Sequence, residues 1–292
     1  MDIYINKDFK PMELAESKEA FDDKDYLFEL KLDGTRTIIF AEPTEILIRN
    51  RRGVILNKTY PELMAIKELV KQKTIFDGEI ILMADGKPSF NQLQQRARLK
   101  DKYKIERLMN EMPVVFVAYD LIYEGKDLTN LTLIERKKKL EKYPNNAFFV
   151  KAKYFENEGI KLYDLTHKAG LEGIVAKRKD SYYYPNKRSK DWLKIKALLK
   201  TPFYICGYQE KDNTLRLLLG EKEGGKYNYV GTISIRPSHK DYPIIKKEPV
   251  VKKGVIEKEE FTYIKPKLNC LIEYMVRTKN GRLRQPIYRG LV

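Results

Sequence analysis

Up to about residue 198, short runs of alternating apolar and polar positions are mixed with stretches of helical periodicity. Alternation predicts strands, because successive side chains of a strand point to opposite faces. The predicted strands are residues 26–30, 37–41, 45–48, 74–76, 80–83, 114–119 and 173–176. A period near 3.6 with one apolar face predicts helices at 61–73, 90–109 and 133–140.

After residue 198 the helical periodicity vanishes. Short apolar runs at 203–208, 215–219, 227–233, 261–264 and 270–277 alternate with turns rich in Gly, Asn and Pro. This spacing predicts a small antiparallel barrel, and five strands suggest an OB-type fold. Residues 237–258 show little pattern and predict a long mobile loop. The chain is therefore expected to be an α+β protein with domains at 1–198 and 199–292.

Composition narrows the class of protein. The 292 residues carry a formal net charge of +16, which points to a polyanionic partner such as nucleic acid, although a basic surface without a catalytic role is the alternative. The two cysteines, in apolar runs, are expected to be reduced, and two isolated histidines offer no zinc site or catalytic relay. No signal peptide or long apolar span is present, so we expect a cytoplasmic protein without a membrane segment.

Four short motifs follow one another in the order that nucleotidyl transfer requires. They are Lys31-Leu32-Asp33-Gly34, Asp77-Gly78-Glu79, Glu172-Gly173 and Trp192-Leu193-Lys194-Ile195-Lys196. Each motif alone is better explained by a surface turn or a solvated strand face. Together, each on or beside a strand-like run, they predict a nucleophile, two acids and paired cations in one pocket.

The chemistry explains why these residue types are needed. A lysine that attacks a phosphate must first lose its proton, and an ordinary lysine is only about 0.04% neutral at pH 7. Lys194 and Lys196, two apart on a strand, would point to one face and supply cations that favour the neutral amine and neutralise a triphosphate. Glu79 and Glu172 offer the hard oxygen ligands that suit Mg²⁺.

These motifs resemble those of the ATP-dependent DNA ligases, and the resemblance covers nearly the whole chain. It implies a nucleotidyltransferase domain (an ATP-grasp-like adenylation domain) followed by an OB-fold domain. In that family Lys31 corresponds to the lysine that becomes adenylated, and Arg36 to the arginine that contacts the ribose. Glu29 matches the side chain that reads the adenine amino group, with Leu30 beside it. Tyr119, in Ala118-Tyr119-Asp120-Leu121-Ile122-Tyr123, matches the ring that stacks on adenine.

Further segments extend the resemblance, with two departures. Arg51 lies in Asn50-Arg51-Arg52-Gly53, which looks like the family's S-R-N-G motif with two replacements, and residues 281–286 resemble its G-x-L-R-x-P. The family commonly continues into an R-x-D-K motif, and no Asp-Lys follows Arg289 here. Arg289 and Lys279 are candidates for its role. Residues 220–226 imitate a phosphate-binding loop but lack the following Ser or Thr and helix, so a hairpin is expected there.

The resemblance implies a minimal two-domain ligase that seals nicks in duplex DNA as a monomer, using ATP and Mg²⁺, with Glu79 and Glu172 near the metal. Lys31 would carry AMP covalently and pass it to a 5′-phosphate. An RNA ligase and an mRNA capping enzyme are alternatives that share K-x-D-G. An NAD-dependent ligase would need a zinc site that is absent from the sequence. A non-catalytic OB protein that binds nucleic acid would explain the charge but not the four motifs.

Overall fold

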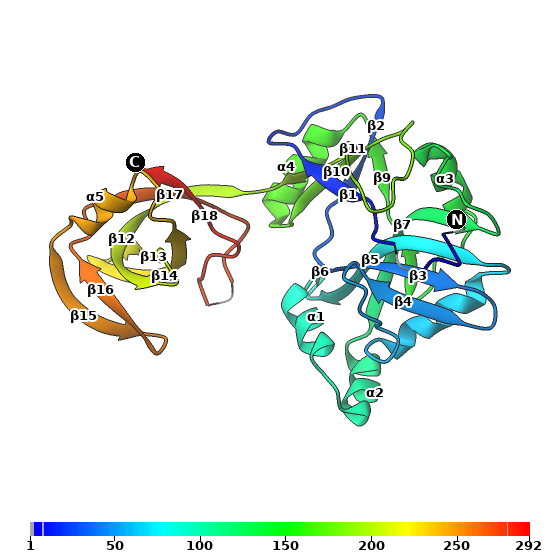
Figure 1. Cartoon of the computed structure of the whole chain (residues 1–292), viewed down its shortest axis with the longest axis horizontal. Coiled ribbons are helices and arrows are strands. Elements are labelled where there is room, and N and C mark those ends of the chain that lie inside the picture. Colours follow the sequence, from blue (N-terminus) through cyan, green and yellow to red (C-terminus); the bar gives the residue numbers. More distant parts are fainter. Residues whose placement is uncertain (1–2, 8, 279) are drawn as a thin grey trace. The chain divides into compact units, whose positions relative to one another are not determined.

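The computed structural model describes residues 3–7, 9–278 and 280–292, and the chain divides into two compact units, Met1–Lys196 and Ala197–Val292 (Figure 1). Lys279, one of the two residues considered for the R-x-D-K role, lies outside the described residues. Within those residues, no helix is long and apolar enough to cross a membrane.

The first unit contains two sheets. One has the order β1-β11-β10-β2-β9, with bounds Glu13–Glu16, Arg188–Lys196, Gly173–Arg178, Tyr26–Leu30 and Tyr154–Glu156. The other has the order β4-β3-β5-β7-β8, with bounds Ile46–Asn50, Thr35–Ala41, Thr74–Ala84, Val114–Glu124 and Phe149–Lys151, and β6 (Lys87–Pro88) pairs with β5. The helices are the 3₁₀ helix η1 (Pro61–Leu69), α1 (Phe90–Ala97), α2 (Lys102–Glu111), α3 (Leu133–Leu140) and α4 (Gly159–Ala169).

The two faces of the β1-β11-β10-β2-β9 sheet differ in character. One face buries Phe28, Ile174 and Ile195, which cluster with Leu162 of α4. Directly opposite residues of an antiparallel pair share a face, and the register places Val175 opposite both Glu29 and Lys194. The other face therefore carries the charged residues of this sheet that belong to the predicted pocket or lie beside it, namely Glu29, Lys31, Lys177, Lys194 and Lys196.

Two predicted helices differ from those observed. The segment 61–73 forms a 3₁₀ helix that ends at Leu69, although Leu63 and Ile66 are fully buried as its periodicity predicts. The segment 90–109 is interrupted between α1 and α2, because Asp101 is an N-cap whose side chain accepts a hydrogen bond from the Lys104 amide at 2.9 Å. The predicted helix 133–140 is confirmed, and the separate strands 74–76 and 80–83 are parts of one strand, β5.

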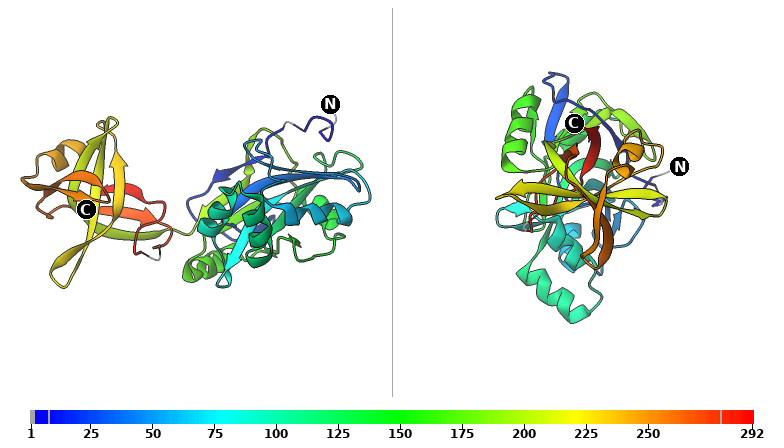
Figure 2. Two further views of the ribbon diagram at one scale, coloured as in Figure 1. Left: turned by 90° about the horizontal axis from the view of Figure 1, so that it is seen from below. Right: turned by 90° about the vertical axis from the view of Figure 1, so that its left-hand side faces the viewer.

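The second unit is a strongly curled sheet (Figure 2). Its strands are β12 (Leu199–Lys211), β13 (Thr214–Glu223), β14 (Lys226–Ile235), β15 (Val250–Ile256), β16 (Glu259–Ile264), β17 (Asn269–Tyr274) and β18 (Ile287–Leu291). The long strand β12 pairs with β13, β16 and β17, and β18 pairs with β17. The Leu283 amide donates to the Val230 carbonyl at 2.9 Å, which joins the segment before β18 to β14. Phe203, Leu217 and Ile272 lie in the core enclosed by this sheet.

The predicted mobile loop at 237–258 is wrong. The segment contains α5 (Tyr242–Lys246) and the edge strand β15, and the fully buried Ile245 holds α5 against the core. Pro243 stands in the first turn of α5, where its missing N–H is tolerated. Residues 220–226 lie in the β13–β14 hairpin, in which Glu223 is opposite Lys226. The prediction of a hairpin at this segment is therefore confirmed.

Candidate active site

Two glycines permit close contacts at the first two motifs, one between the K-x-D-G turn and β5 and one between the D-G-E segment of β5 and its neighbour β7. A Cβ on Gly34 would stand 2.2 Å from the Ile80 carbonyl oxygen and 2.8 Å from Cγ of Glu79. A Cβ on Gly78 would stand 2.5 Å from the Val117 carbonyl oxygen and 2.4 Å from the Phe116 ring. Both contacts are shorter than side chains tolerate, so only glycine allows the K-x-D-G turn and the D-G-E strand to approach their neighbours this closely.

Lys31 lies among carboxylates that come from distant parts of the sequence. Its Nζ is 2.6 Å from Oε1 of Glu172, and the Lys31 and Glu172 side chains are 19% and 9% exposed. The Lys31 amide donates to the Gly173 carbonyl at 2.9 Å, which fixes β2 beside β10 at this point. Burial raises the pKa of the Glu79 carboxyl to about 8, and the charges of Lys31 and Arg36 oppose this rise while that of Glu172 adds to it. Lys31, the predicted nucleophile, and both predicted metal ligands therefore share one electrostatic environment.

A buried carboxylate, that of Asp77, fixes the orientation of Arg36. Its Nε and Nη2 donate to Oδ1 and Oδ2 of Asp77 at 3.2 and 2.7 Å, a bidentate pair. The Tyr183 hydroxyl also donates to Oδ2 of Asp77, at 2.8 Å. Asp77 of the D-G-E motif thus orients Arg36. Glu79, two residues later, faces Lys31 and Arg36.

Tyr119 is the extra residue of a β-bulge. Asp77 is opposite Asp120 and Gly78 is opposite Ala118, so β7 contains one residue more than β5 at this point. Nζ of Lys177 lies 4.2 Å from the Tyr119 ring centroid and 4.3 Å from that of Trp192, and the Arg36 guanidinium lies 5.6 Å from the Tyr119 ring. The half-buried Tyr119 ring is therefore held by two cations and by an edge contact with Trp192.

Glu29 is buried, with 2% of its surface exposed, and it binds two lysines. Lys177 of β10 donates to its Oε2 at 2.8 Å, and Lys137 of α3 donates to its Oε1. Burial lowers the pKa of Lys177 to about 8, opposed by Glu29 and reinforced by Lys137. Leu30 lies opposite Ile174, so its side chain is on the other face of the sheet from Glu29 and Lys31.

The remaining predicted residues lie at the edge of this arrangement. Nζ of Lys194 and Nζ of Lys196 are 3.6 and 3.9 Å from the two carboxylate oxygens of Glu16 on β1, so both side chains are on one face as predicted. Arg51 is exposed in the turn after β4, and its amide donates to the Arg36 carbonyl at 3.2 Å.

The sequence analysis assigned no role to Lys177, Lys137, Asp77 or Tyr183. Lys177 carried a detectable signal, because it directly follows the apolar run 173–176 at an inward position of the strand, five residues after Glu172. Lys137 carried none, since it lies in a run of three consecutive lysines on α3 and only the packing shows that it is buried.

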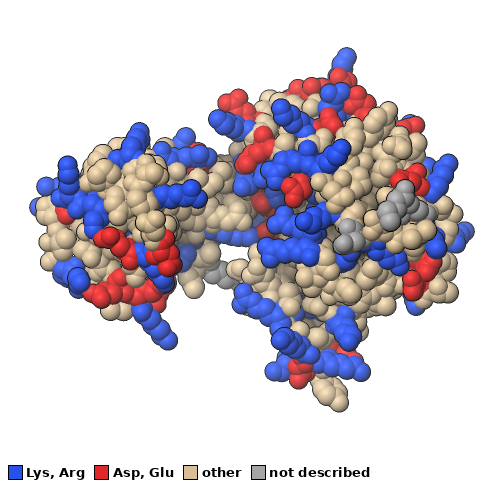
Figure 3. Space-filling model, viewed as in Figure 1, with Lys and Arg blue, Asp and Glu red and all other residues tan. Residues whose placement is uncertain are grey.

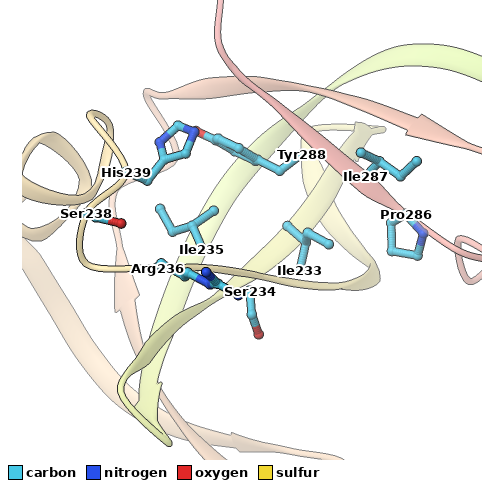
Figure 4. A pocket seen from close by; sticks show the side chains of 9 residues that line it. All are labelled: Ile233, Ser234, Ile235, Arg236, Ser238, His239, Pro286, Ile287 and Tyr288. Atoms are coloured by element: carbon cyan, nitrogen blue, oxygen red, sulfur yellow. The ribbon is translucent and has the colours of Figure 1, made fainter. Parts of the chain in front are cut away.

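The second unit has a hollow of about 480 Å³ between β14 and β18, and Figure 4 shows its lining residues. Among the residues that the structure describes, no site residue predicted from sequence and no acidic side chain lines this hollow. Arg289, the other residue considered for the R-x-D-K role, donates to Oε2 of Glu273 from Nε at 2.7 Å. Cys206 and Cys270 are buried free thiols, and no group of three or more metal-binding side chains of the types His, Cys, Asp and Glu occurs within the described ranges.

A partly buried lysine beside two carboxylates, an aromatic ring on a bulge and paired lysines on one strand are the arrangement expected of a covalent nucleotidyltransferase. The model of the "ATP dependent DNA ligase domain" family matches residues 8–196, and the chain belongs to the ATP-dependent DNA ligase family. This family joins DNA through a covalent lysyl-AMP intermediate, with ATP and Mg²⁺.

Individual relatives agree with this assignment. The chain is 31% identical to the SPbeta prophage-derived DNA ligase-like protein LigB of Bacillus subtilis over 96% of this chain and 97% of that protein. It is 29% identical to the multifunctional non-homologous end joining protein LigD of Mycolicibacterium smegmatis over 98% of this chain, which spans 38% of that longer protein. A solved structure of mycobacterial DNA ligase D complexed with ATP and MES is similar with a TM-score of 0.60 and 27% identity, covering 97% of this chain and 95% of that one.

Proposed function

We propose that this chain seals nicks or breaks in duplex DNA with Lys31 as its nucleophile. The observation that carries the assignment is the position of Nζ of Lys31, 2.6 Å from Glu172, in the environment that also raises the pKa of Glu79. In the first step the Lys31 amine attacks the α-phosphorus of ATP. A P–N bond forms, the bond from the α-phosphorus to the bridging oxygen breaks, and pyrophosphate leaves.

Two further transfers regenerate the enzyme. A 5′-phosphate oxygen of the DNA attacks the phosphorus of the lysyl-AMP, the P–N bond breaks, and Lys31 regains its amine. The 3′-hydroxyl then attacks the phosphorus of that 5′-phosphate and AMP leaves, which joins the strand. Lys194 and Lys196 would lower the charge on the leaving phosphates in these steps if they release Glu16.

The residues present fit a magnesium ion. Glu79 and Glu172 are carboxylates close enough to influence one another, and Mg²⁺ commonly binds one or two carboxylates and completes its shell with water and phosphate oxygens. When bound there, the ion would stabilise charge on the phosphoryl oxygens. A Glu172 carboxylate engaged with the ion would no longer balance the charge of Lys31.

Tyr119 is proposed as the platform on which the adenine stacks. Its position on a bulge and the cations of Lys177 and Arg36 fix the ring without covering all of it. Because Glu29 is bound by two lysines, it would act on the base together with Lys177 and not as a free carboxylate. Arg36 would reach the ribose while Asp77 holds it, and Arg51 would approach the nucleotide from the exposed turn.

The curled sheet of residues 197–292 is proposed to be an OB-type domain that binds DNA, and the protein is proposed to act as a monomer. Lys and Arg side chains are numerous on the surface of both units (Figure 3), which suits a polyanionic duplex. Contacts to the phosphate backbone carry little sequence information, so little sequence preference is expected.

The decisive experiment uses ATP labelled at the α-phosphate, followed by a denaturing gel. The natural protein should form a labelled adduct and seal a nicked duplex. Lys31→Ala should lose the adduct entirely, yet keep measurable sealing of a nick that already carries 5′-AMP, because only the first two transfers use the amine. Lys58→Ala, a change of a lysine outside the site, serves as the control. A labelled Lys31→Ala protein would refute the assignment of the nucleophile.

A further inference from the structure

The loop between β10 and β11 carries two exposed tyrosines on a rigid support. Tyr182 and Tyr184 are 46% and 38% exposed, whereas Tyr183 between them is 2% exposed. The Tyr183 hydroxyl donates to Oδ2 of Asp77 at 2.8 Å and accepts from the Met12 amide at 3.1 Å. Because these hydrogen bonds hold Tyr183 in the interior, the rings of Tyr182 and Tyr184 remain at the surface.

The same loop is also joined to the N-terminal segment. The Asn186 amide donates to the Lys10 carbonyl, and the Lys10 amide donates to Oδ1 of Asn186, both at 2.8 Å. The Tyr184 amide donates to Sδ of Met12 at 3.3 Å. These contacts bring Lys10 beside the loop and restrain the backbone on which the exposed rings stand.

The charge around these rings is positive and unbalanced. Nearby acids already bind other cations, since Asp180 binds Arg178 at 2.9 Å and Glu13 binds Arg188 at 2.7 Å. Three exposed lysines lie on this loop or on segments joined to it: Lys187, whose amide donates to the Tyr184 carbonyl, Lys10, whose carbonyl accepts from Asn186, and Lys190, in the strand β11 that follows the loop. In the part of the chain that the structure describes, no carboxylate forms an ion pair with them. Exposed aromatic rings beside unpaired cations are typical of surfaces that bind a nucleic-acid strand.

We propose that Tyr182 and Tyr184 form a stacking platform for unpaired bases at the end of the strand being joined, while Lys10, Lys187 and Lys190 bind its phosphates. The identity of this partner rests on the proposed ligase function. Unpaired bases can stack on these tyrosine rings, whereas the bases of a duplex already stack on their neighbours in the strand. The platform is linked to the nucleotide pocket, since Tyr183 and Arg36 bind the same Asp77 carboxylate.

The test compares two DNA ligands that differ only in unpaired bases. One is a fully paired nicked duplex, and the other carries a short single-stranded overhang with 2-aminopurine, whose fluorescence falls when the base stacks. The Tyr182→Ala/Tyr184→Ala double variant should bind the overhang about tenfold or more weakly and lose the quenching, with little change on the paired duplex. The Tyr182→Phe/Tyr184→Phe variant should behave like the natural protein.

Two controls keep the outcomes separate. Tyr103→Ala removes a tyrosine of α2 that is 82% exposed, and it should leave binding to both ligands unchanged. Formation of the lysyl-AMP adduct by the double alanine variant shows that its pocket is folded. Unchanged affinity for the overhang, or an equal loss on both ligands, would overturn the platform. Failure of the natural protein to form the adduct would instead overturn the proposed function.

Discussion

At the residue scale, Glu29 has a structural role that its position two residues before the nucleophile did not reveal. It is the shared counter-ion of Lys137 and Lys177, all three groups being buried. Removing one lysine leaves a balanced pair, whereas removing the carboxylate leaves two buried cations without a partner. Glu29 therefore supports the packing of α3 against β2 and β10, beside the proposed base pocket.

We predict that Glu29→Gln lowers the free energy of unfolding by about 3 kcal/mol or more, because breaking a buried pair strands its partner charge. Lys177→Met should cost less, since Glu29 keeps Lys137. Urea denaturation of the variants measures both values. Equal, small losses in the two variants would show that Glu29 is not the shared counter-ion, and that its importance is confined to the nucleotide.

Glu79 provides a prediction on pH. Its pKa is raised to about 8 in the folded protein by burial, from an ordinary value of 4.5. Between these values the folded state holds a proton that the unfolded state has released, so the stability of the metal-free protein should fall as pH rises from about 5 to about 8. The contribution is at most about 1.4 kcal/mol for each pH unit.

Glu79→Gln removes this titration and nearly keeps the shape of the side chain. The variant should therefore become more stable than the natural protein, by a margin that grows from pH 5 to pH 8. Urea denaturation in chelator-treated buffer at several pH values measures that margin. A margin that stays constant with pH would show that Glu79 is ionised throughout this range, and the argument from burial would fail.

At the element scale, Gly34 decides how the turn after β2 meets β5. The Gly34→Ala change would bring a Cβ to 2.2 Å from a backbone oxygen of β5, which cannot be relieved by a side-chain rotation. We expect a loss of roughly 1–3 kcal/mol in stability, typical of overpacking, and a large loss of adduct formation because Lys31 shifts relative to Glu79.

Gly53→Ala is the matched control for this change. Gly53 also lies in a turn beside the site, but its position has open space around the missing Cβ and a φ of 85°. Its variant should show backbone strain in thermal unfolding with little loss of adduct formation. Similar adduct formation by the two variants would contradict a specific role for the Gly34 contact.

Local patterns predicted most strands and the helix Leu133–Leu140, because alternation and helical period depend on which side chains are buried. They failed where tertiary packing decides the outcome. The edge strand β15 is mostly exposed, so its sequence has little apolar alternation, and only pairing with β16 makes it a strand. The helix α4 was not predicted at all, although Leu162 on its buried face packs against the sheet.

The candidate site likewise contains residues that local motifs predicted and residues that only the tertiary structure shows. The motifs identified Lys31, Glu79 and Glu172 as neighbours, and the structure brings them together although they lie far apart in the sequence. The supporting residues could not be predicted, since Lys137 and Tyr183 reach the site from α3 and from a loop. Their role depends on the meeting of two sheets, which no local pattern encodes.

At the scale of the whole molecule, truncation can test which steps of the reaction need the second unit. The first unit has its own buried clusters, including Phe76, Phe116 and Trp192, and every residue predicted to bind the nucleotide or the metal lies within it. We therefore expect residues 1–196 to fold alone and to bind ATP, which the fluorescence of the single tryptophan, Trp192, can report.

The truncated protein should nevertheless form the lysyl-AMP adduct about a hundredfold more slowly than the full chain, because we propose that the second unit helps to position the leaving pyrophosphate. Arg289, now bound to Glu273, is the described residue proposed for this task. Arg289→Ala in the full chain should then reproduce part of the loss, whereas Lys258→Ala, a change in the β15–β16 turn, should not. Adduct formation measured in parallel for these four proteins decides the matter. Equal rates for the full and truncated chains would mean that residues 197–292 serve DNA binding alone.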